Sequence, residues 1–421
     1  MESSGRSSSG ARIALGLLLT INLFNYIDRQ MLAALEPDIR ATFFAPGDVN
    51  AMTKTGIWLG DAFLITYMIS APILGLLADR ISRWAIIGVA VILWSLASGA
   101  SGLAATFTML LMTRVFIGIG EGGYGPAAPT ILSDLFPIES RGKIMAIFCA
   151  AIPVGSALGY VIGGQMGAHF GWRSAFYLVT PPGLLLGLLC FWQRDPRVVG
   201  HQVIQKSPRR RLSDYSKLFR TRSYFINCIA QTLMTFAAGG LGFWISEYLR
   251  FRNQSPAGGR TIFGLVTVVA GLSSTIIGGI VADKLRPRFP GSYFSVSGIG
   301  MVLSCPFFVV SLYIPFPMAW VPMFLAIFLL FLNTGPSNTA LANVSLPAVR
   351  ATAFAVNIFI IHLLGDVQAF WMLGYIGGHF NIRVAFLFVS AVILASGLVW
   401  IFGAKYLPQD TARVEAATAQ S

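Results

Sequence analysis

Long apolar stretches follow one another along almost the whole chain, and short polar stretches separate them. Each apolar stretch holds about 20 residues, which is enough for one helix to cross a bilayer. The pattern therefore predicts an all-α membrane protein with twelve transmembrane helices, at residues 12–36, 56–78, 84–105, 108–132, 142–167, 172–193, 223–249, 260–282, 291–313, 318–343, 350–376 and 381–407.

Two short motifs occur twice, once in each half of the chain. The segment that contains His169 and Arg173 recurs around His379 and Arg383, with every match 210 positions later. Gly-Leu-Leu-Ala-Asp-Arg at residues 75–80 recurs as Gly-Ile-Val-Ala-Asp-Lys, 204 positions later. Duplicated membrane domains are usual in carriers, because two similar halves can rock about a site held between them. We therefore expect two pseudo-symmetric six-helix bundles and a transport function.

The longest polar stretch divides the predicted helices into six and six. It spans residues 194–222 and contains nine of the 30 lysines and arginines of the chain. We expect an N-terminal bundle at residues 1–193, a basic linker at residues 194–222 and a C-terminal bundle at residues 223–421.

Composition and charge agree with a membrane protein. Charged residues make up 11% of the chain, against roughly 25% in soluble domains. Most of the net charge of +13 lies on one side of the predicted topology, where loops and tails hold 21 lysines and arginines against 7 on the other side. The positive-inside rule then places both termini and the linker in the cytoplasm. Because this topology accounts for the basic charge, nucleic-acid binding is not supported.

The sequence carries no motif for a cofactor or a metal ion. The four cysteines fall within predicted helices without metal-ligand spacing. The G-x-x-x-x-G-K-[ST] loop of ATP-driven pumps is absent as well. The Ser/Gly-rich start does not resemble a secretory signal, so we expect the first helix to be retained as an anchor.

Ionisable residues inside a span are candidates for function, because each costs at least a few kcal/mol in hydrocarbon. In the first predicted helix, Asn25, Tyr26 and Arg29 lie on one face, and Asp28 is turned away by about 100°. In the fourth, Arg114 and Glu121 share a face. At 1.5 Å per residue, Arg29 and Arg114 lie roughly 10 Å and 9 Å from the outer helix ends, and Glu121 lies near mid-membrane.

Two interpretations fit these charges. They could form salt bridges that only hold helices together, or a polar centre that binds an anionic headgroup and a proton. Arginine suits the anion, because its guanidinium forks onto phosphate or carboxylate. A buried carboxylate, Glu121 or Asp28, suits the proton, because burial disfavours its charged form.

The second half offers mostly neutral polar groups. Asn333 and Asn338 flank a Gly-Pro pair that predicts a break in the helix, and we expect both asparagines to line the substrate site. His362 and Asp366 lie one turn apart on one face, which is compatible with a gating role and equally with simple packing of a histidine. His-x-x-x-Asp also occurs in acyltransferases, but no second catalytic constellation accompanies it, so we do not expect an enzyme.

Glycines predict close helix packing. Gly155, Gly159 and Gly163 recur every fourth residue in the fifth predicted helix. Glycines of the eighth, among them Gly278, could form the facing surface.

Residues 75–83 resemble the G-x-L-a-D-R-x-G-R loop motif of the major facilitator superfamily, with Ser82 where glycine is usual. The copy that contains Asp283 resembles the weaker second-half form of this motif. The resemblance implies that Asp79, Arg80 and Arg83 lock the cytoplasmic side of the carrier, and that Asp283 has a related gating role.

Three stretches resemble the spinster branch of that superfamily: Asn-Tyr-Ile-Asp-Arg-Gln at residues 25–30, Gly-Ile-Gly-Glu-Gly-Gly-Tyr-Gly-Pro-Ala at residues 118–127, and residues 151–160. The eleventh predicted helix, residues 350–376, agrees with the spinster pattern at residues 363–366. It departs from that pattern at Gln368 and Ala369, where Ser-Pro is common. Eukaryotic spinster proteins are implied to move lysophospholipids and sphingosine phosphates. The short tails resemble bacterial relatives, which implies a bacterial inner membrane.

We therefore expect a proton-coupled secondary carrier that works by alternating access, as a monomer in membrane lipid, on an amphipathic anion such as a lysolipid. One alternative is a carrier of a small soluble organic anion, or an exporter of a drug, with the same fold. A lipid-modifying membrane enzyme or a channel is the alternative of another class.

The topology can be tested by cysteine labelling. Single cysteines placed in residues 194–222 should react with a membrane-impermeant maleimide only after intact cells are opened, because the linker is expected in the cytoplasm. Labelling of the linker from outside intact cells would overturn the topology.

Overall fold

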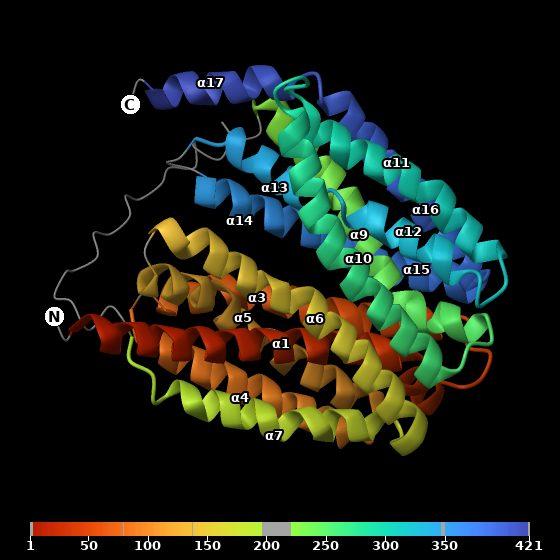
Figure 1. The fold of residues 1–421 in the computed structure, drawn as a ribbon. Coiled ribbons are helices and arrows are strands. Elements are labelled where there is room, and N and C mark those ends of the chain that lie inside the picture. The colour runs from red at the N-terminus through yellow and green to blue at the C-terminus, as the bar shows by residue number, and fades with distance from the viewer. Residues whose placement is uncertain (1–2, 79, 137, 196–219, 347–349, 420–421) are drawn as a thin grey trace. The chain divides into compact units, whose positions relative to one another are not determined.

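The computed structural model describes residues 3–78, 80–136, 138–195, 220–346 and 350–419, and these residues form helices joined by short turns (Figure 1). The elements are α1 (Ser3–Phe43), α2 (Ala51–Thr55), η1 (Gly56–Asp61), α3 (Ala62–Ala78), α4 (Arg83–Gly102), α5 (Phe107–Leu135), α6 (Ile138–Phe170), α7 (Trp172–Cys190), α9 (Arg222–Phe251), α10 (Pro256–Leu285), α11 (Ser292–Tyr313), α12 (Trp320–Phe331), α13 (Thr334–Asn343), α14 (Arg350–Ile361), η3 (His362–Asp366), α15 (Val367–His379), α16 (Ile382–Gly403) and α17 (Leu407–Ala419).

The predicted all-α membrane fold is confirmed. In the described part of the chain, 11 helical segments are long and apolar enough to cross a membrane. The remaining predicted span, the fourth, at residues 108–132, corresponds to α5, which is helical over 29 residues. It is less apolar than the others because it carries Arg114, Glu121 and several glycines, and this polarity makes it a candidate for function.

The chain forms two compact units. Unit 1 comprises Met1–Gln205 and Ile245–Leu265, and unit 2 comprises Lys206–Trp244 and Val266–Ser421. The adjoining ends of α9 and α10 therefore group with unit 1. Most of the predicted linker, residues 196–219, lies outside the described residues.

The first predicted helix ends too early. The sequence interpretation stopped it before Pro37, but α1 continues through this proline to Phe43. Proline removes one backbone hydrogen bond and need not end a helix that is packed on its neighbours. With the longer helix, Arg29 lies about 21 Å from the Phe43 end of α1, and Glu121 lies about 21 Å from the Phe107 end of α5. The two side chains are thus at matching depths.

The glycines of α6 pack against α1 and not against the glycines of α10, the partner expected from the sequence. A β-carbon at Gly155 or Gly159 would lie 2.6 Å from the carbonyl oxygen of Leu23 or 2.7 Å from that of Ile27. Gly278 of α10 instead meets the carbonyl oxygen of Leu332, at 2.0 Å. The expectation that these two sets of glycines face each other is wrong, because glycine spacing shows a close approach but does not identify the partner.

The predicted break around the Gly-Pro pair is confirmed. The span divides into α12, which ends at Phe331, and α13, which begins at Thr334. Pro336 has no N–H to donate to the carbonyl of Leu332, and Gly278 lets that carbonyl approach α10. The break is therefore packed against a neighbouring helix.

Candidate functional site

An ion pair joins α1 to α5 within unit 1. Nε of Arg29 donates to Oε2 of Glu121 at 2.6 Å, and Nη2 lies 2.6 Å from the same oxygen. The Arg29 side chain is 20% exposed, whereas that of Glu121 is fully buried. Arg29 thus pairs with a buried carboxylate while part of its own side chain stays exposed.

Aromatic rings surround the guanidinium of Arg29. Its central carbon lies 5.2 Å from the ring centre of Tyr26, 4.9 Å from that of Phe63 and 5.1 Å from that of Tyr67. Cation–π contacts of this kind stabilise the charge by about 0.5–2 kcal/mol each. The rings also exclude water, so the arginine is held as a preorganised cation beside apolar surface.

Glycines of α5 allow the ring-bearing helix to come close. A β-carbon at Gly118 would lie 2.0 Å from Oγ1 of Thr66 and 2.5 Å from the carbonyl oxygen of Phe63, and one at Gly122 would lie 2.1 Å from Oγ of Ser70. The spacing of α5 and α3 therefore places Phe63 against Arg29.

A second acid and base lie deeper in unit 1. Asp28 is buried and accepts a hydrogen bond from Oγ of Ser98 on α4, at 2.5 Å. Arg114 is 1% exposed, with its guanidinium 5.2 Å from the ring centre of Phe63. Among the described residues, Nε and Nη1 of Arg114 and Oδ2 of Asp28 have no hydrogen-bond partner. A cavity of about 10 Å³ adjoins Asp28 and Ser98, roughly the room for one water.

The other predicted polar residues of α1 lie beside the pair. Asn25 is buried, and Tyr26 is half-buried next to Arg29. Asn22 donates to the carbonyl of Phe148 on α6 at 3.0 Å, and Tyr124 donates to the carbonyl of Leu18 at 2.7 Å. These two bonds fix the rotation of α1, and with it the direction of Arg29.

The loop-motif residues lie at the start of α4. Arg83 is buried and bridges two acids, with Nη1 at 2.7 Å from Asp134 and Nη2 at 2.9 Å from Asp195. Arg80 is exposed, and Asp79 lies outside the described residues. In unit 2, Asp283 accepts a hydrogen bond from the hydroxyl of Tyr293 at 2.8 Å.

His362 and Asp366 form a pair in unit 2. Nδ1 of His362 lies 2.6 Å from Oδ2 of Asp366, on the π-helical turn η3. Such turns are frequent at functional sites. A β-carbon at Gly239 of α9 would lie 1.9 Å from Oδ1 of Asp366, so only glycine leaves room there for the carboxylate.

The two predicted asparagines of unit 2 have different surroundings. Asn333 is fully buried, lies between α12 and α13, and donates to the carbonyl of Leu330 in the last turn of α12. Asn338 is exposed and donates to the carbonyl of Thr334 at 2.8 Å. Only Asn338 is open to a ligand in this structure.

The sequence interpretation missed a neutral polar network in unit 2. Gln231 accepts from Nδ2 of Asn357 at 2.7 Å and donates to Oγ of Ser337 at 3.0 Å. Trp400 donates to Asn227 at 2.9 Å. Buried amides one turn apart on α9, at positions 227 and 231, were the available signal. The network ties α9, α13, α14 and α16 together.

It also missed a charged cluster within unit 1. Arg40 bridges Glu36, at 2.9 Å, and Glu247. Asp38 follows Glu36 by two residues on α1. Its Oδ2 lies 2.8 Å from Nη1 of Arg260, a buried residue of α10. These ion pairs hold one end of α1 to the neighbouring ends of α9 and α10. Acids and bases near predicted helix ends were visible in the sequence, but their pairing over more than 200 positions was not.

In the part of the chain that the structure describes, no group of three or more His, Cys, Asp or Glu side chains could hold a metal ion.

Known membrane transporters are similar to this chain over most of its length. The sequence model of the Major Facilitator Superfamily matches residues 18–367 of this chain. Protein spinster homolog 1 of Homo sapiens is 31% identical over 397 residues, which cover 89% of this chain and 74% of the relative. The Sphingosine-1-phosphate transporter SPNS2 of Danio rerio is 32% identical over 390 residues, which cover 86% of this chain and 75% of the relative.

Two solved structures share the fold. A crystal structure of a bacterial homolog to the human lysosomal transporter Spinster, in an inward-facing and unoccupied conformation, has a TM-score of 0.80 at 22% identity and covers 96% of this chain and 97% of its own. The crystal structure of a D-xylose-proton symporter superposes with a TM-score of 0.73 at 18% identity, and the match covers 92% of this chain and 96% of the symporter chain.

The Asp38–Arg260 pair can be tested by exchanging its charges. Asp38→Arg should lower the thermal stability of the purified protein, because it leaves buried Arg260 beside a like charge, at a cost of about 2–5 kcal/mol. The double variant Asp38→Arg, Arg260→Asp should recover a measurable part of the loss. Arg413→Asp, which changes an exposed arginine of α17, is the control. Additive losses in the double variant would show that the pair does not hold these helices.

Proposed function

The chain belongs to the major facilitator superfamily and to its spinster branch, and on this basis we propose that it is a proton-coupled secondary carrier of an amphipathic anion, such as a lysophospholipid or a sphingosine-phosphate-like lipid. It is an integral membrane transporter, as its relatives are, and not an enzyme. The sphingosine-1-phosphate transporters among the relatives support the lipid substrate.

The observation that carries the proposal is the ion pair between Arg29, which is partly exposed, and Glu121, which is buried. Arg29 keeps N–H groups free of the carboxylate, and a phosphate or carboxylate can accept them in a forked geometry. The rings of Tyr26, Phe63 and Tyr67 would then contact the apolar part of the substrate next to its headgroup. Asn25 and Tyr26 complete the proposed binding residues of unit 1. In unit 2, Asn338 is the exposed candidate for substrate binding, and Asn333 supports the broken helix from inside.

Coupling to protons follows from the fact that Glu121 has one counter-ion within hydrogen-bond distance. When a substrate anion takes Arg29, the buried carboxylate loses that partner and binds a proton in its place. Proton and anion then promote each other's binding, because the coupling between two sites is reciprocal. Arg114 and Asp28 provide the charge balance behind this pair, with Asp28 as the second candidate for the proton.

The gate is proposed at the ends of the helices. Asp79, Arg80 and Arg83 would fasten the cytoplasmic side, with Arg83 already held by Asp134 and Asp195. Asp283 would act in the second half, and the His362–Asp366 pair would govern the movement of η3 against α9. We place the protein in a bacterial inner membrane, as a monomer with both termini in the cytoplasm.

Variants of the central pair test the mechanism. Arg29→Ala should weaken binding of a lysolipid by roughly 10–150-fold, because charged hydrogen bonds contribute about 1.5–3 kcal/mol. Glu121→Gln should bind the lysolipid but lose the pH dependence of binding. In proteoliposomes, pH gradients of opposite direction should drive different fluxes in the wild type and equal fluxes in Glu121→Gln.

The matched control is Glu415→Gln, which makes the same exchange on an exposed side chain of α17. It should leave binding and pH response unchanged. If Glu121→Gln still concentrates the substrate under a pH gradient alone, Glu121 is not the coupling group. Binding assays with a soluble dicarboxylate and a cationic drug run in parallel, and tighter binding of either than of the lysolipid would favour the alternative substrate class.

The gate prediction concerns Asp79. Asp79→Asn should reduce the transport rate several-fold at unchanged expression and thermal stability, because it removes one charge of the proposed conformational lock. Uptake at matched protein levels measures this, with Asp48→Asn, in an exposed loop, as the control. Normal transport by Asp79→Asn would remove the motif from the mechanism.

A further inference from the structure

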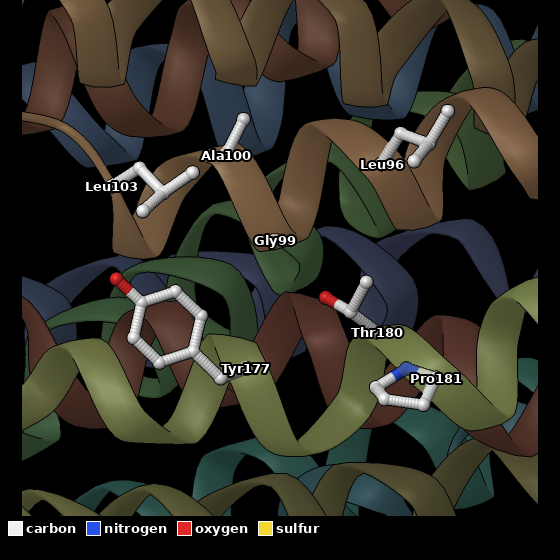
Figure 2. Close-up of a pocket in the computed structure, with 7 residues that line it drawn as sticks. All are labelled: Leu96, Gly99, Ala100, Leu103, Tyr177, Thr180 and Pro181. Carbon is white, nitrogen blue, oxygen red and sulfur yellow. The ribbon is translucent and has the colours of Figure 1, made fainter.

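A groove runs between α4 and α7 on the surface of unit 1 (Figure 2). It has a volume of about 320 Å³, at the small end of the roughly 300–1,000 Å³ of ligand pockets. Leu96 and Leu103 of α4 border it and are 53% and 69% exposed. Since α4 and α7 both cross the membrane, these leucines face hydrocarbon.

The two helices touch along the floor of the groove. A β-carbon at Gly99 would lie 2.8 Å from Oγ1 of Thr180, and one at Gly102 would lie 2.6 Å from the ring of Tyr177. Figure 2 shows Thr180 and Tyr177 lying opposite this part of α4. The glycines therefore bring the helices together, and the larger side chains on either side form the walls.

The hydroxyl groups at the groove already donate to the backbone. Thr180 donates to the carbonyl of Phe176 at 2.8 Å, and Tyr177 donates to that of Gly102 at 2.7 Å. The groove thus presents mainly carbon to an occupant, so a hydrocarbon chain fits it better than a polar molecule.

The depth of the groove matches one leaflet. Tyr177 and Pro181 lie about 8 Å and 14 Å along α7 from its first residue, Trp172. Half of a bilayer's hydrocarbon core is about 15 Å thick. The groove therefore spans the acyl-chain region of the leaflet at the Trp172 end of α7.

Arg173 lies on α7 one helical turn before Tyr177, at the Trp172 end of the groove. Nη2 of Arg173 donates to the carbonyl of Ala104 at 3.0 Å, and its guanidinium lies 4.2 Å from the ring centre of Trp172. A guanidinium has five N–H donors, so this one can bond a phosphate as well. Tyr177, which is 44% exposed, is of a residue type enriched where the chains of a bilayer meet its headgroups.

We propose that this groove is a binding site for a phospholipid of the leaflet at the Trp172 end, with the phosphate on Arg173 and one acyl chain between α4 and α7. The site is separate from the Arg29–Glu121 centre. It rests on the membrane-spanning fold alone and not on the proposed substrate.

The test uses photolabelling in vesicles. The protein is reconstituted in phosphatidylglycerol that contains a small fraction of the same lipid with a diazirine in its acyl chain, and labelled peptides are mapped by mass spectrometry. Labels should concentrate on Leu96, Leu103 and Tyr177, well above the labelling of Ile65 and Ile69, which are exposed on α3. Ala100→Trp should reduce them about tenfold, the effect of blocking a contact worth about 1.4 kcal/mol.

Leu188→Trp, which adds the same ring to an exposed position farther along α7, should leave the labelling unchanged. Arg173→Gln should lower it, and Arg173→Lys should restore part of it. Labelling in the wild type that is as strong at Ile65 and Ile69 of α3 would show surrounding lipid only and overturn the proposal. This wild-type result decides the question even if Ala100→Trp does not fold. Preferential labelling by a sterol probe would also overturn it. No substrate or pH gradient is used, so failure here leaves the proposed transport function untouched.

Discussion

The ion pair between Arg29 and Glu121 is the interaction around which unit 1 is arranged. A charge inside a membrane needs a partner, because hydrocarbon cannot solvate it. Glu121 meets this need with Arg29 at 2.6 Å, and Arg29 receives three aromatic rings in addition. This arrangement requires α1, α3 and α5 to lie close together. The glycines of α5 and α6 permit that approach, since a β-carbon at Gly118 or Gly159 would meet the backbone of the next helix.

The two units contain different kinds of buried polar side chains. Unit 1 holds formal charges, in the ion pair Arg29–Glu121 and in the buried side chains of Asp28 and Arg114. Unit 2 holds neutral amides and hydroxyls in a network around Gln231, with His362 and Asp366 as its ionisable pair in η3. The charged centre of unit 1 fits the anionic head of the proposed substrate. The comparison with sphingosine-1-phosphate transporters supports the same substrate class.

Much of the fold could be predicted because membrane crossing imposes a simple rule on the sequence. A helix of about 20 apolar residues is the cheapest way to satisfy the backbone in lipid, so apolar runs give the spans almost directly. Polar residues within spans marked Arg29, Glu121 and His362 for the same energetic reason. The Gly-Pro pair marked the break at Asn333. The end of α1 was not predictable, because Pro37 reads as a stop in sequence and its tolerance depends on neighbouring helices.

The sequence by itself determined which residues carry charge into the membrane and on which helix face each one lies. It did not determine which charges meet. Arg29 was expected at the level of Arg114, and the structure pairs it with Glu121 because α1 extends to Phe43. Asp38 with Arg260 and Arg40 with Glu247 are likewise chosen by packing. Periodicity along one helix fixes the direction of a side chain relative to that helix only. The rotation and depth of each helix against its neighbours depend on contacts between residues far apart in the chain, and these exist only in the tertiary structure.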